Sequence, residues 1–301
     1  ASSFGTSTFD TKRTEINWQN DLTLSENTDF TVGINHRKTD ASITGFSTFD
    51  GDITNNAIYA SMLNRKGKFN LDLSGRYDDH SQAGGEFTGQ VATGYSFTPN
   101  TTAYISYGTA FRAPNINDLY NPGSPSFSDP TVFQFAGNPD LKPETSKSFE
   151  VGLKTNIGDH SRLNFNLFRT TVEDQIVFQG LNNQLINLDE TLLKGVEISL
   201  SGQRGRYDWA LGATVQRAID NNTKERLVRR PNNKFTLDLG AQLTAKTRLG
   251  LDALFSSDRI DNDFSSFPSS KTSLKSYSLV NLSLNHKVSK SVNLGLRVEN
   301  V

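Results

Sequence analysis

The sequence predicts an all-β protein, a transmembrane antiparallel up-and-down β-barrel with about fourteen strands. Three observations predict this fold. Apolar and polar residues alternate with a period of two in every strong segment of the chain. Tight turns and long polar loops alternate between these segments. No segment carries the 3.6-residue stripe of an amphipathic helix, so crossover helices and a parallel sheet are not expected.

The segment KFNLDLSGRYDD at 68–79 shows the alternation clearly. In an extended chain, successive side chains point to opposite faces, so one face of this segment is apolar and the other is polar. The apolar face carries Phe69, Leu71, Leu73, Gly75 and Tyr77, and the polar face carries Asn70, Asp72, Ser74, Arg76 and Asp78. The same pattern recurs at 102–111, 163–167, 196–200, 235–239 and 292–299.

The connections between strands fall into two classes that alternate strictly. Tight turns are expected at 25–28, 66–67, 98–100, 157–160, 204–206, 245–246 and 289–290. Longer polar loops are expected at about 41–52, 80–86, 113–143, 174–190, 220–231 and 260–274. A meander with tight turns at one rim and long loops at the other is typical of outer-membrane barrels, whereas Greek-key sandwiches mix their connection lengths.

The polar faces carry too many charges for a dry interior. They include Asp72, Arg76, Asp78, Glu197, Asp238, Arg297 and Glu299. In a wide barrel the hydrated side is the lumen and the apolar side is covered by lipid. A soluble β protein with its apolar faces packed inward, of a structural or adhesive kind, remains an alternative on periodicity alone.

Composition excludes several classes of protein. No window approaches the roughly 18 consecutive apolar residues of a transmembrane helix. The chain has 31 basic and 32 acidic side chains, so no basic footprint indicates nucleic acid. It has no cysteine, and therefore no disulfide, thiol chemistry or thiolate metal site. Residues 1–10 lack the features of a signal peptide, and RVENV ends within a strand-like pattern, so we expect a piece of a longer chain.

No catalytic or metal-binding template fits the sequence. The four histidines, His36, His80, His160 and His286, are isolated and are expected at the surface or the rims. The acidic stretches 50–56 and 258–263 lack the glycine and the closing glutamate of a calcium-binding loop. We find no phosphate-cradling glycine loop and no Ser/His/Asp set. We therefore expect no enzyme activity, no metal and no cofactor.

Two motifs resemble the barrel of TonB-dependent outer-membrane receptors. YISYGTAFRAPNINDLY at 104–120 resembles the aromatic strand and FRAP corner of that family, and GNPDLKPETSKSFEVGLK at 137–154 resembles the entry into its next strand. Pro114 and Pro143 fix φ and lack N–H donors, so each would stop the strand ladder where the long loop begins or ends. By parity, Glu150 is expected to face the lumen.

Further segments resemble the cobalamin-receptor branch of this family. They lie at 75–97, 193–200, 225–239 and 258–271. The resemblance implies a twenty-two-stranded barrel in the outer membrane of a Gram-negative bacterium, of which residues 1–301 would be the C-terminal part. The N-terminal plug and the early strands would lie outside this chain, and with them the segment through which the TonB–ExbB–ExbD system acts. It also implies a monomeric barrel surrounded by outer-membrane lipid and lipopolysaccharide.

The resemblance implies three substrate-binding residues in the outer loops. Arg229, the first arginine of LVRRP, matches a loop arginine that contacts the corrinoid. Phe264 stands where the family commonly has tyrosine, so stacking is retained and the hydroxyl contact is lost. Thr8 matches a loop threonine across one gap. Solvated basic loops or phosphate contacts remain the alternative for Arg229 and Arg230. The family's calcium-binding loops resemble nothing in this chain.

The function expected from this resemblance is TonB-dependent uptake of cobalamin. The FRAP and NPDLKPE motifs are shared by the whole family, so they do not indicate which ligand is bound. A receptor for a ferric siderophore is therefore the alternative within transport, and a non-transporting surface β protein is the alternative outside it.

Overall fold

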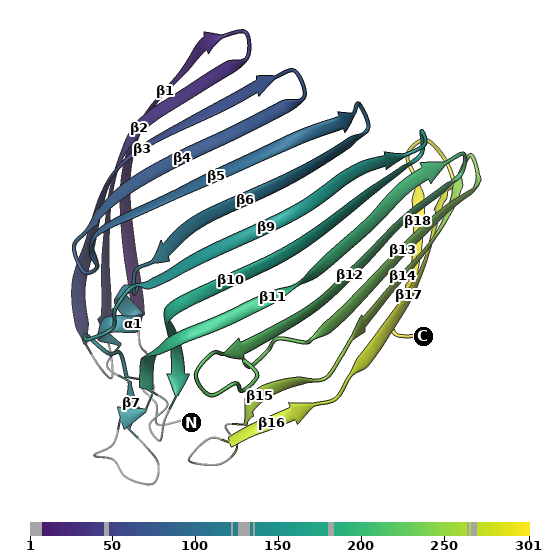
Figure 1. Ribbon diagram of the computed structural model, residues 1–301. Coiled ribbons are helices and arrows are strands. Elements are labelled where there is room, and N and C mark those ends of the chain that lie inside the picture. Colours follow the sequence, from purple (N-terminus) through teal and green to yellow (C-terminus); the bar gives the residue numbers. More distant parts are fainter. Residues whose placement is uncertain are drawn as a thin grey trace.

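The computed structural model describes residues 8–44, 48–121, 123–125, 133–134, 136–179, 184–263, 265 and 270–301. One antiparallel sheet of fourteen strands dominates it, in which the strands follow one another in chain order (Figure 1). Its first half contains β1 (Thr8–Ser25), β2 (Thr28–Thr44), β3 (Phe49–Lys66), β4 (Phe69–His80), β5 (Gly84–Thr98), β6 (Thr101–Arg112) and β9 (Glu144–Ile157). Its second half contains β10 (Ser161–Gln179), β11 (Gln184–Arg204), β12 (Tyr207–Asp220), β13 (Asn233–Thr244), β14 (Thr247–Ser256), β17 (Tyr277–Lys287) and β18 (Asn293–Val298).

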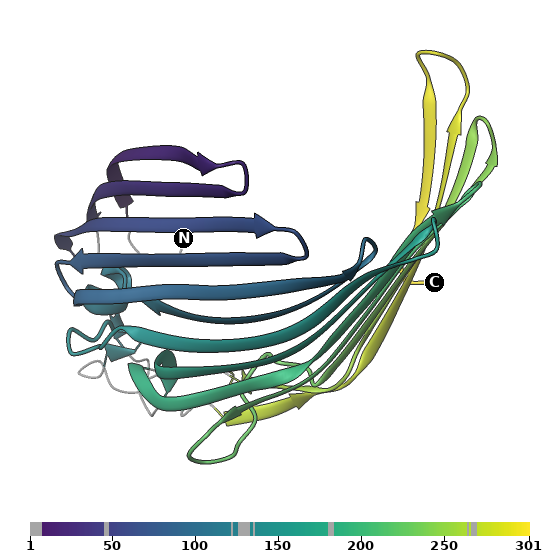
Figure 2. The same cartoon turned by 45° about the horizontal axis from the view of Figure 1, so that its top comes forward.

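The sheet curves into an open trough with β1 and β18 at its two edges (Figure 2). The small elements all lie in long connections. They are α1 (Ile116–Tyr120), the pair β7 (Ser124–Pro125) and β8 (Phe133–Gln134), and the pair β15 (Arg259–Asp263) and β16 (Ser270–Leu274). Among the described residues, no helix is long and apolar enough to cross a membrane. The observed meander of fourteen strands confirms the predicted fold class.

The two rims of the trough differ as the sequence predicts. Tight turns join β1 to β2, β3 to β4, β5 to β6, β9 to β10, β11 to β12 and β13 to β14 at one rim. The long connections, including those that carry α1 and the β15–β16 hairpin, gather at the other rim, at the lower left and bottom of Figure 1. We call these the turn rim and the loop rim.

Several of the predicted loops are wrong in extent. In the predicted loop 80–86, β4 pairs with β5 up to His80–Gly84, and the predicted loop 260–274 holds the β15–β16 hairpin. In the predicted loop 41–52, β2 pairs with β3 up to Ile43–Phe49, and in the predicted loop 174–190, β10 pairs with β11 up to Gln179–Gln184. The strands continue past the expected ends because contacts made far along the chain support them there: Ile176 of β10 and Leu185 of β11 pack against Leu119 and Leu141 of the long connection. Backbone pairing still satisfies the N–H and C=O groups there.

The two faces of the sheet divide by polarity as predicted. The apolar side chains of the alternating pattern lie exposed on one face, which we call the outer face; Ile105 is 42% exposed and Leu294 is 60% exposed. No dry core lies between the sheet's two edges among the described residues. The buried apolar cluster of Leu119, Leu141, Ile176 and Leu185 sits instead under the connections at the loop rim. An exposed apolar face of this size requires a lipid cover.

Candidate functional site

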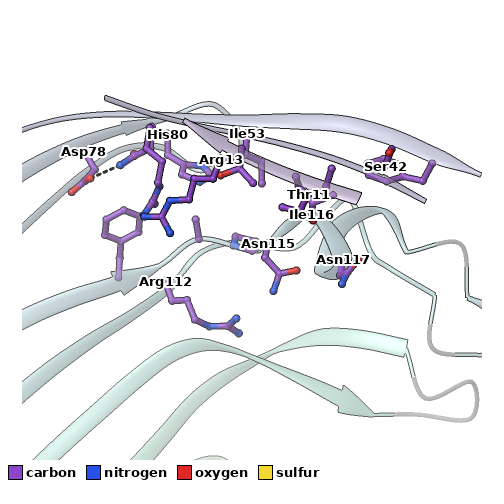
Figure 3. A pocket seen from close by; sticks show the side chains of 18 of the residues that line it. Thr11, Arg13, Ser42, Ile53, Asp78, His80, Arg112, Asn115, Ile116 and Asn117 are labelled. Atoms are coloured by element: carbon purple, nitrogen blue, oxygen red, sulfur yellow. Dashed lines mark hydrogen bonds between the residues drawn. The ribbon is translucent and has the colours of Figure 1, made fainter. Parts of the chain in front are cut away.

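A cavity of about 650 Å³ opens on the inner face at the loop rim (Figure 3). Strands β1, β2, β3 and β4 supply one side, and the end of β6 with the segment 113–117 supplies the other. These side chains lie together because every second residue of each strand points to the inner face. Apolar residues such as Ile53 and Ile116 line it beside polar ones such as Asn55 and Asn115.

Four arginines from four strands line this cavity: Arg13, Arg37, Arg76 and Arg112. Arg76 donates two hydrogen bonds to Asp78, at 2.7 and 2.8 Å, and Asn55 donates a third to the same carboxylate at 2.7 Å. These contacts hold the Arg76 guanidinium in place.

The other three arginines of the cavity differ in how firmly they are held. Arg13 pairs with Glu15, and Arg112 pairs with Asp118 at 3.3 Å and Glu144 at 2.8 Å. Arg37 forms no ion pair among the described residues, so its charge is the one most available to a ligand. The arrangement suits an anionic or strongly polar group.

His80 closes one corner of the cavity as a structural residue. Its Nδ1 accepts hydrogen bonds from the backbone N–H groups of Gln82 and Ala83, both at 3.2 Å. This nitrogen therefore carries a lone pair and is already engaged in the β4–β5 turn. The sequence places His80 correctly at a rim, but the side chain is buried there, at 6% exposure.

The FRAP and NPDLKPE motifs meet at the edge of this cavity. Strand β6 ends at Arg112 and β9 begins at Glu144, and these two residues form the last pair of the ladder. Pro114 and Pro143 lie just beyond it, as predicted from their missing N–H donors. The ion pair between Arg112 and Glu144 thus joins the two motifs across the strands.

Helix α1 is fixed to the second motif by backbone contacts. Asn115 caps the helix in a capping box with Asp118. The N–H of Gly137 donates to the Asn121 carbonyl and the N–H of Asn138 donates to the Asp118 carbonyl, both at 2.8 Å. A Cβ at Gly137 would lie 2.6 Å from the Leu119 backbone, so only glycine allows this approach. Helix α1 and residues 137–138 are therefore held together as one unit at the edge of the cavity.

The inner face stays polar further along the trough. Tyr104 donates to Asn166 at 3.3 Å, and Asn166 donates to Glu150 at 3.4 Å. A second cavity of about 380 Å³ next to this network is lined by polar side chains that include Glu197 and Lys234. Glu150 lies on the inner face as predicted, which is the face expected to line a hydrated lumen.

Arg229 lies in the connection between β12 and β13 and is tied to the β15–β16 hairpin. Its Nε donates to Asp261 at 2.9 Å, and its backbone N–H donates to the Ile260 carbonyl at 2.7 Å. Its φ is +60°, a left-handed conformation that these contacts support. The guanidinium holds the pKa of Asp261 below its ordinary value, and the Arg226 guanidinium does the same for the pKa of Asp258.

The structure brings only part of the predicted substrate site together. Arg229 contacts the hairpin in whose connection Phe264 falls, but Phe264 itself lies outside the described residues. Thr8 begins β1, the first strand of the sheet, and pairs with Thr44, whereas Arg229 follows β12, the tenth strand in the sheet order. Their role in ligand binding stays a prediction.

The arginine cavity is the feature that sequence reasoning missed. Its four arginines come from β1, β2, β4 and β6, and the strand register decides that their side chains lie at the same level of the inner face. The available signal was an arginine at an inner-face position near the loop-rim end of each strand, as at Arg76 in the segment 68–79. Across the ranges that the structure describes, no group of His, Asp and Glu could hold a metal ion.

Known proteins resemble this chain along almost its entire length. It is 25% identical over 300 residues to the vitamin B12 transporter BtuB of Photobacterium profundum, covering 97% of this chain and 46% of the relative. It is 28% identical over 301 residues to BtuB of Vibrio vulnificus, covering 96% and 45%. The chain thus spans less than half the length of these relatives, and its predicted place in their C-terminal part stays a prediction.

Solved structures share the fold at low identity. The siderophore receptor PirA of Acinetobacter baumannii superposes with a TM-score of 0.79 and 18% identity, over 98% of this chain and 51% of PirA. The profile of the family described as TonB dependent receptor-like, beta-barrel, matches residues 1–301. Its members are receptors of the Gram-negative outer membrane and not enzymes, in agreement with the predicted location and class. The chain belongs to the β-barrel family of TonB-dependent outer-membrane receptors.

Proposed function

We propose that this chain is the barrel portion of a transporter that takes up cobalamin across the outer membrane. The observation that carries the proposal is the similarity of almost the whole chain to two vitamin B12 transporters. The hydrated inner face would form the conduit and the loop rim would capture the ligand. Uptake would be driven by the TonB–ExbB–ExbD system acting on the N-terminal plug region of the full-length protein.

In this proposal Arg229, Phe264 and Thr8 contact the corrinoid from the loop rim. The docking of the connection 221–232 onto the β15–β16 hairpin supports it, because Arg229 is thereby held in one place before a ligand arrives. A pre-positioned contact loses less conformational entropy on binding than a mobile one.

Isothermal titration of the full-length protein with cyanocobalamin tests the proposal. We expect binding at micromolar concentration or tighter. Arg229→Ala should weaken it by about tenfold, the size of one lost charged hydrogen bond. Asp261→Asn is the matched control: it loosens the hairpin but keeps the arginine, so it should weaken binding less. Absence of cyanocobalamin binding to the unmodified protein would refute the proposal.

A receptor for a ferric chelate is the second candidate, and the arginine cavity favours it. Arg37 has no ion pair among the described residues, and the paired guanidinium groups of Arg13, Arg76 and Arg112 add hydrogen-bond donors, which suits an anion better than a corrinoid. The same titration with a ferric tris-catecholate separates the two candidates. Binding of the chelate without binding of cyanocobalamin, abolished by Arg37→Gln, would establish the second candidate.

A further inference from the structure

Three basic residues form a row across the outer face of the sheet. The register pairs Arg169 of β10 with Lys194 of β11, and Lys194 with Arg217 of β12. All three side chains are exposed. They share the face of the apolar residues, since the next row of that face towards the turn rim is Leu167, Val196 and Val215. This outer basic row therefore faces the membrane.

The outer basic row lies at the expected level of the lipid head groups. Ten residues separate Tyr207 from Arg217 in β12. At about 3.3 Å per residue and a tilt near 45°, this spans roughly 23 Å of membrane, close to the roughly 25 Å of a barrel's apolar band. On the other side of Arg169 the same row continues with Phe149 and Tyr107, both exposed aromatic residues. Aromatic residues are typical of the membrane interface.

The row is electrostatically uncompensated within the described part of the chain. No ion pair of the described residues involves Arg169, Lys194 or Arg217. Their nearest basic neighbour is Lys147, offset towards the loop rim, and it already pairs with Glu173 at 2.7 Å. The acidic residues Glu173 and Glu190 oppose each other two rows further towards the loop rim. Like charges directly opposite one another destabilise a sheet unless an anion lies between them.

We propose that the outer basic row binds the phosphate group of a membrane lipid in the outer leaflet. The two guanidinium groups present donor forks that match phosphate oxygens, and the central ammonium adds a point charge. The acyl chains of that lipid would lie along the apolar rows headed by Leu167, Val196 and Val215. The row is near the loop rim, so the outer leaflet supplies the lipid. This site is independent of the transported ligand.

Native mass spectrometry of the full-length protein tests the site. The protein is reconstituted in phosphatidylcholine nanodiscs with added diphosphoryl lipid A, and the lipid retained after release into detergent is counted. We expect retained lipid A in the unmodified protein and at least about a tenfold loss in the triple variant Arg169→Gln, Lys194→Gln, Arg217→Gln, since each basic residue contributes to holding an anionic lipid. Lipid A without its phosphates should not be retained.

The matched control removes the same charge from the inner face of β9, β10 and β13. The variant Arg162→Gln, Lys154→Gln, Lys234→Gln should retain lipid A like the unmodified protein. If the outer triple variant does not fold, the three single variants replace it, and each should lose part of the retained lipid A. A salt titration of the unmodified protein should then also show that retention of lipid A falls as the salt concentration rises. Equal retention in both triple variants, retention of dephosphorylated lipid A, or displacement by inorganic phosphate alone would overturn the proposal.

Discussion

Leu73 and Ser74 are neighbours in β4, yet their side chains lie on opposite faces of the sheet. Leu73 stands midway between the exposed aromatics Phe69 and Tyr77 and pairs with Met62 and Val91. We expect Leu73→Arg to destabilise the full-length barrel in lipid vesicles by about 2–4 kcal/mol, the cost of a cation near the bilayer midplane. Ser74→Arg, on the wet inner face, should cost under about 1 kcal/mol. Urea unfolding in vesicles measures the free energy of unfolding of both variants. A larger loss for Ser74→Arg than for Leu73→Arg would show that the lipid-facing and lumen-facing sides have been assigned the wrong way round.

Arg112 is the residue through which two distant motifs support each other. It is 48% exposed on its side chain and joins Asp118 to Glu144. Solvent screening limits its contribution, so we expect Arg112→Ala to cost about 1 kcal/mol or less. The effect should be local: faster hydrogen exchange at 116–121 with unchanged exchange in β10 and β11. Arg112→Lys keeps the charge without the planar fork and should restore only part of the protection.

The β15–β16 hairpin is an element held to its neighbour largely by charge. Arg226 pairs with Asp258 at 2.6 Å, Arg229 with Asp261 at 2.9 Å and Lys271 with Glu225 at 2.5 Å. The pKa values of Asp258 and Asp261 are lowered in the folded protein because each accepts a hydrogen bond from an arginine. Their contribution to docking is therefore complete above the unfolded value of about 3.9 and is lost as the pH falls through the lower folded values.

We accordingly expect the hairpin to detach on acidification below about pH 4 while the sheet remains paired. A spin-label pair bridging the connection 221–232 and β16 reports the separation. In the variant Asp258→Asn, Asp261→Asn the acid-dependent part of this change should be strongly reduced. A pH response of the same size in that variant would show that the detachment depends on titratable side chains other than Asp258 and Asp261.

The elements show what the sequence can and cannot predict. Period two and turn chemistry are local, so the faces of 68–79, the six tight turns between β1 and β14, and the stops at Pro114 and Pro143 were predictable. The extent of the hairpins at 41–52 and 174–190 was not, because the partners that bury Ile176 and Leu185 there are Leu119 and Leu141, which come from a distant connection. The arginine cavity was not predictable either, since it depends on register across several strands.

At the scale of the whole molecule, the two rims give the trough a direction across the membrane. The long connections carry the arginine cavity, α1 and the docked hairpin, whereas the other rim has tight turns such as 158–160. Long loops face the outside in outer-membrane barrels and short turns face the periplasm. The ligand cavity should therefore open to the medium, and the outer basic row should lie in the outer leaflet.

This orientation can be read with single introduced cysteines, because residues 1–301 contain none and any cysteine elsewhere in the full-length protein can be replaced by serine. In the full-length protein, Arg230→Cys places a thiol at the loop rim, where Arg230 is exposed, and Asp159→Cys places one at the exposed turn between β9 and β10. A maleimide too large to pass porins should label Arg230→Cys in intact cells. It should label Asp159→Cys only after the outer membrane is permeabilised. Labelling of Asp159→Cys alone in intact cells would show that the turn rim faces the medium. The cavity would then open to the periplasm, and the outer basic row would lie in the inner leaflet.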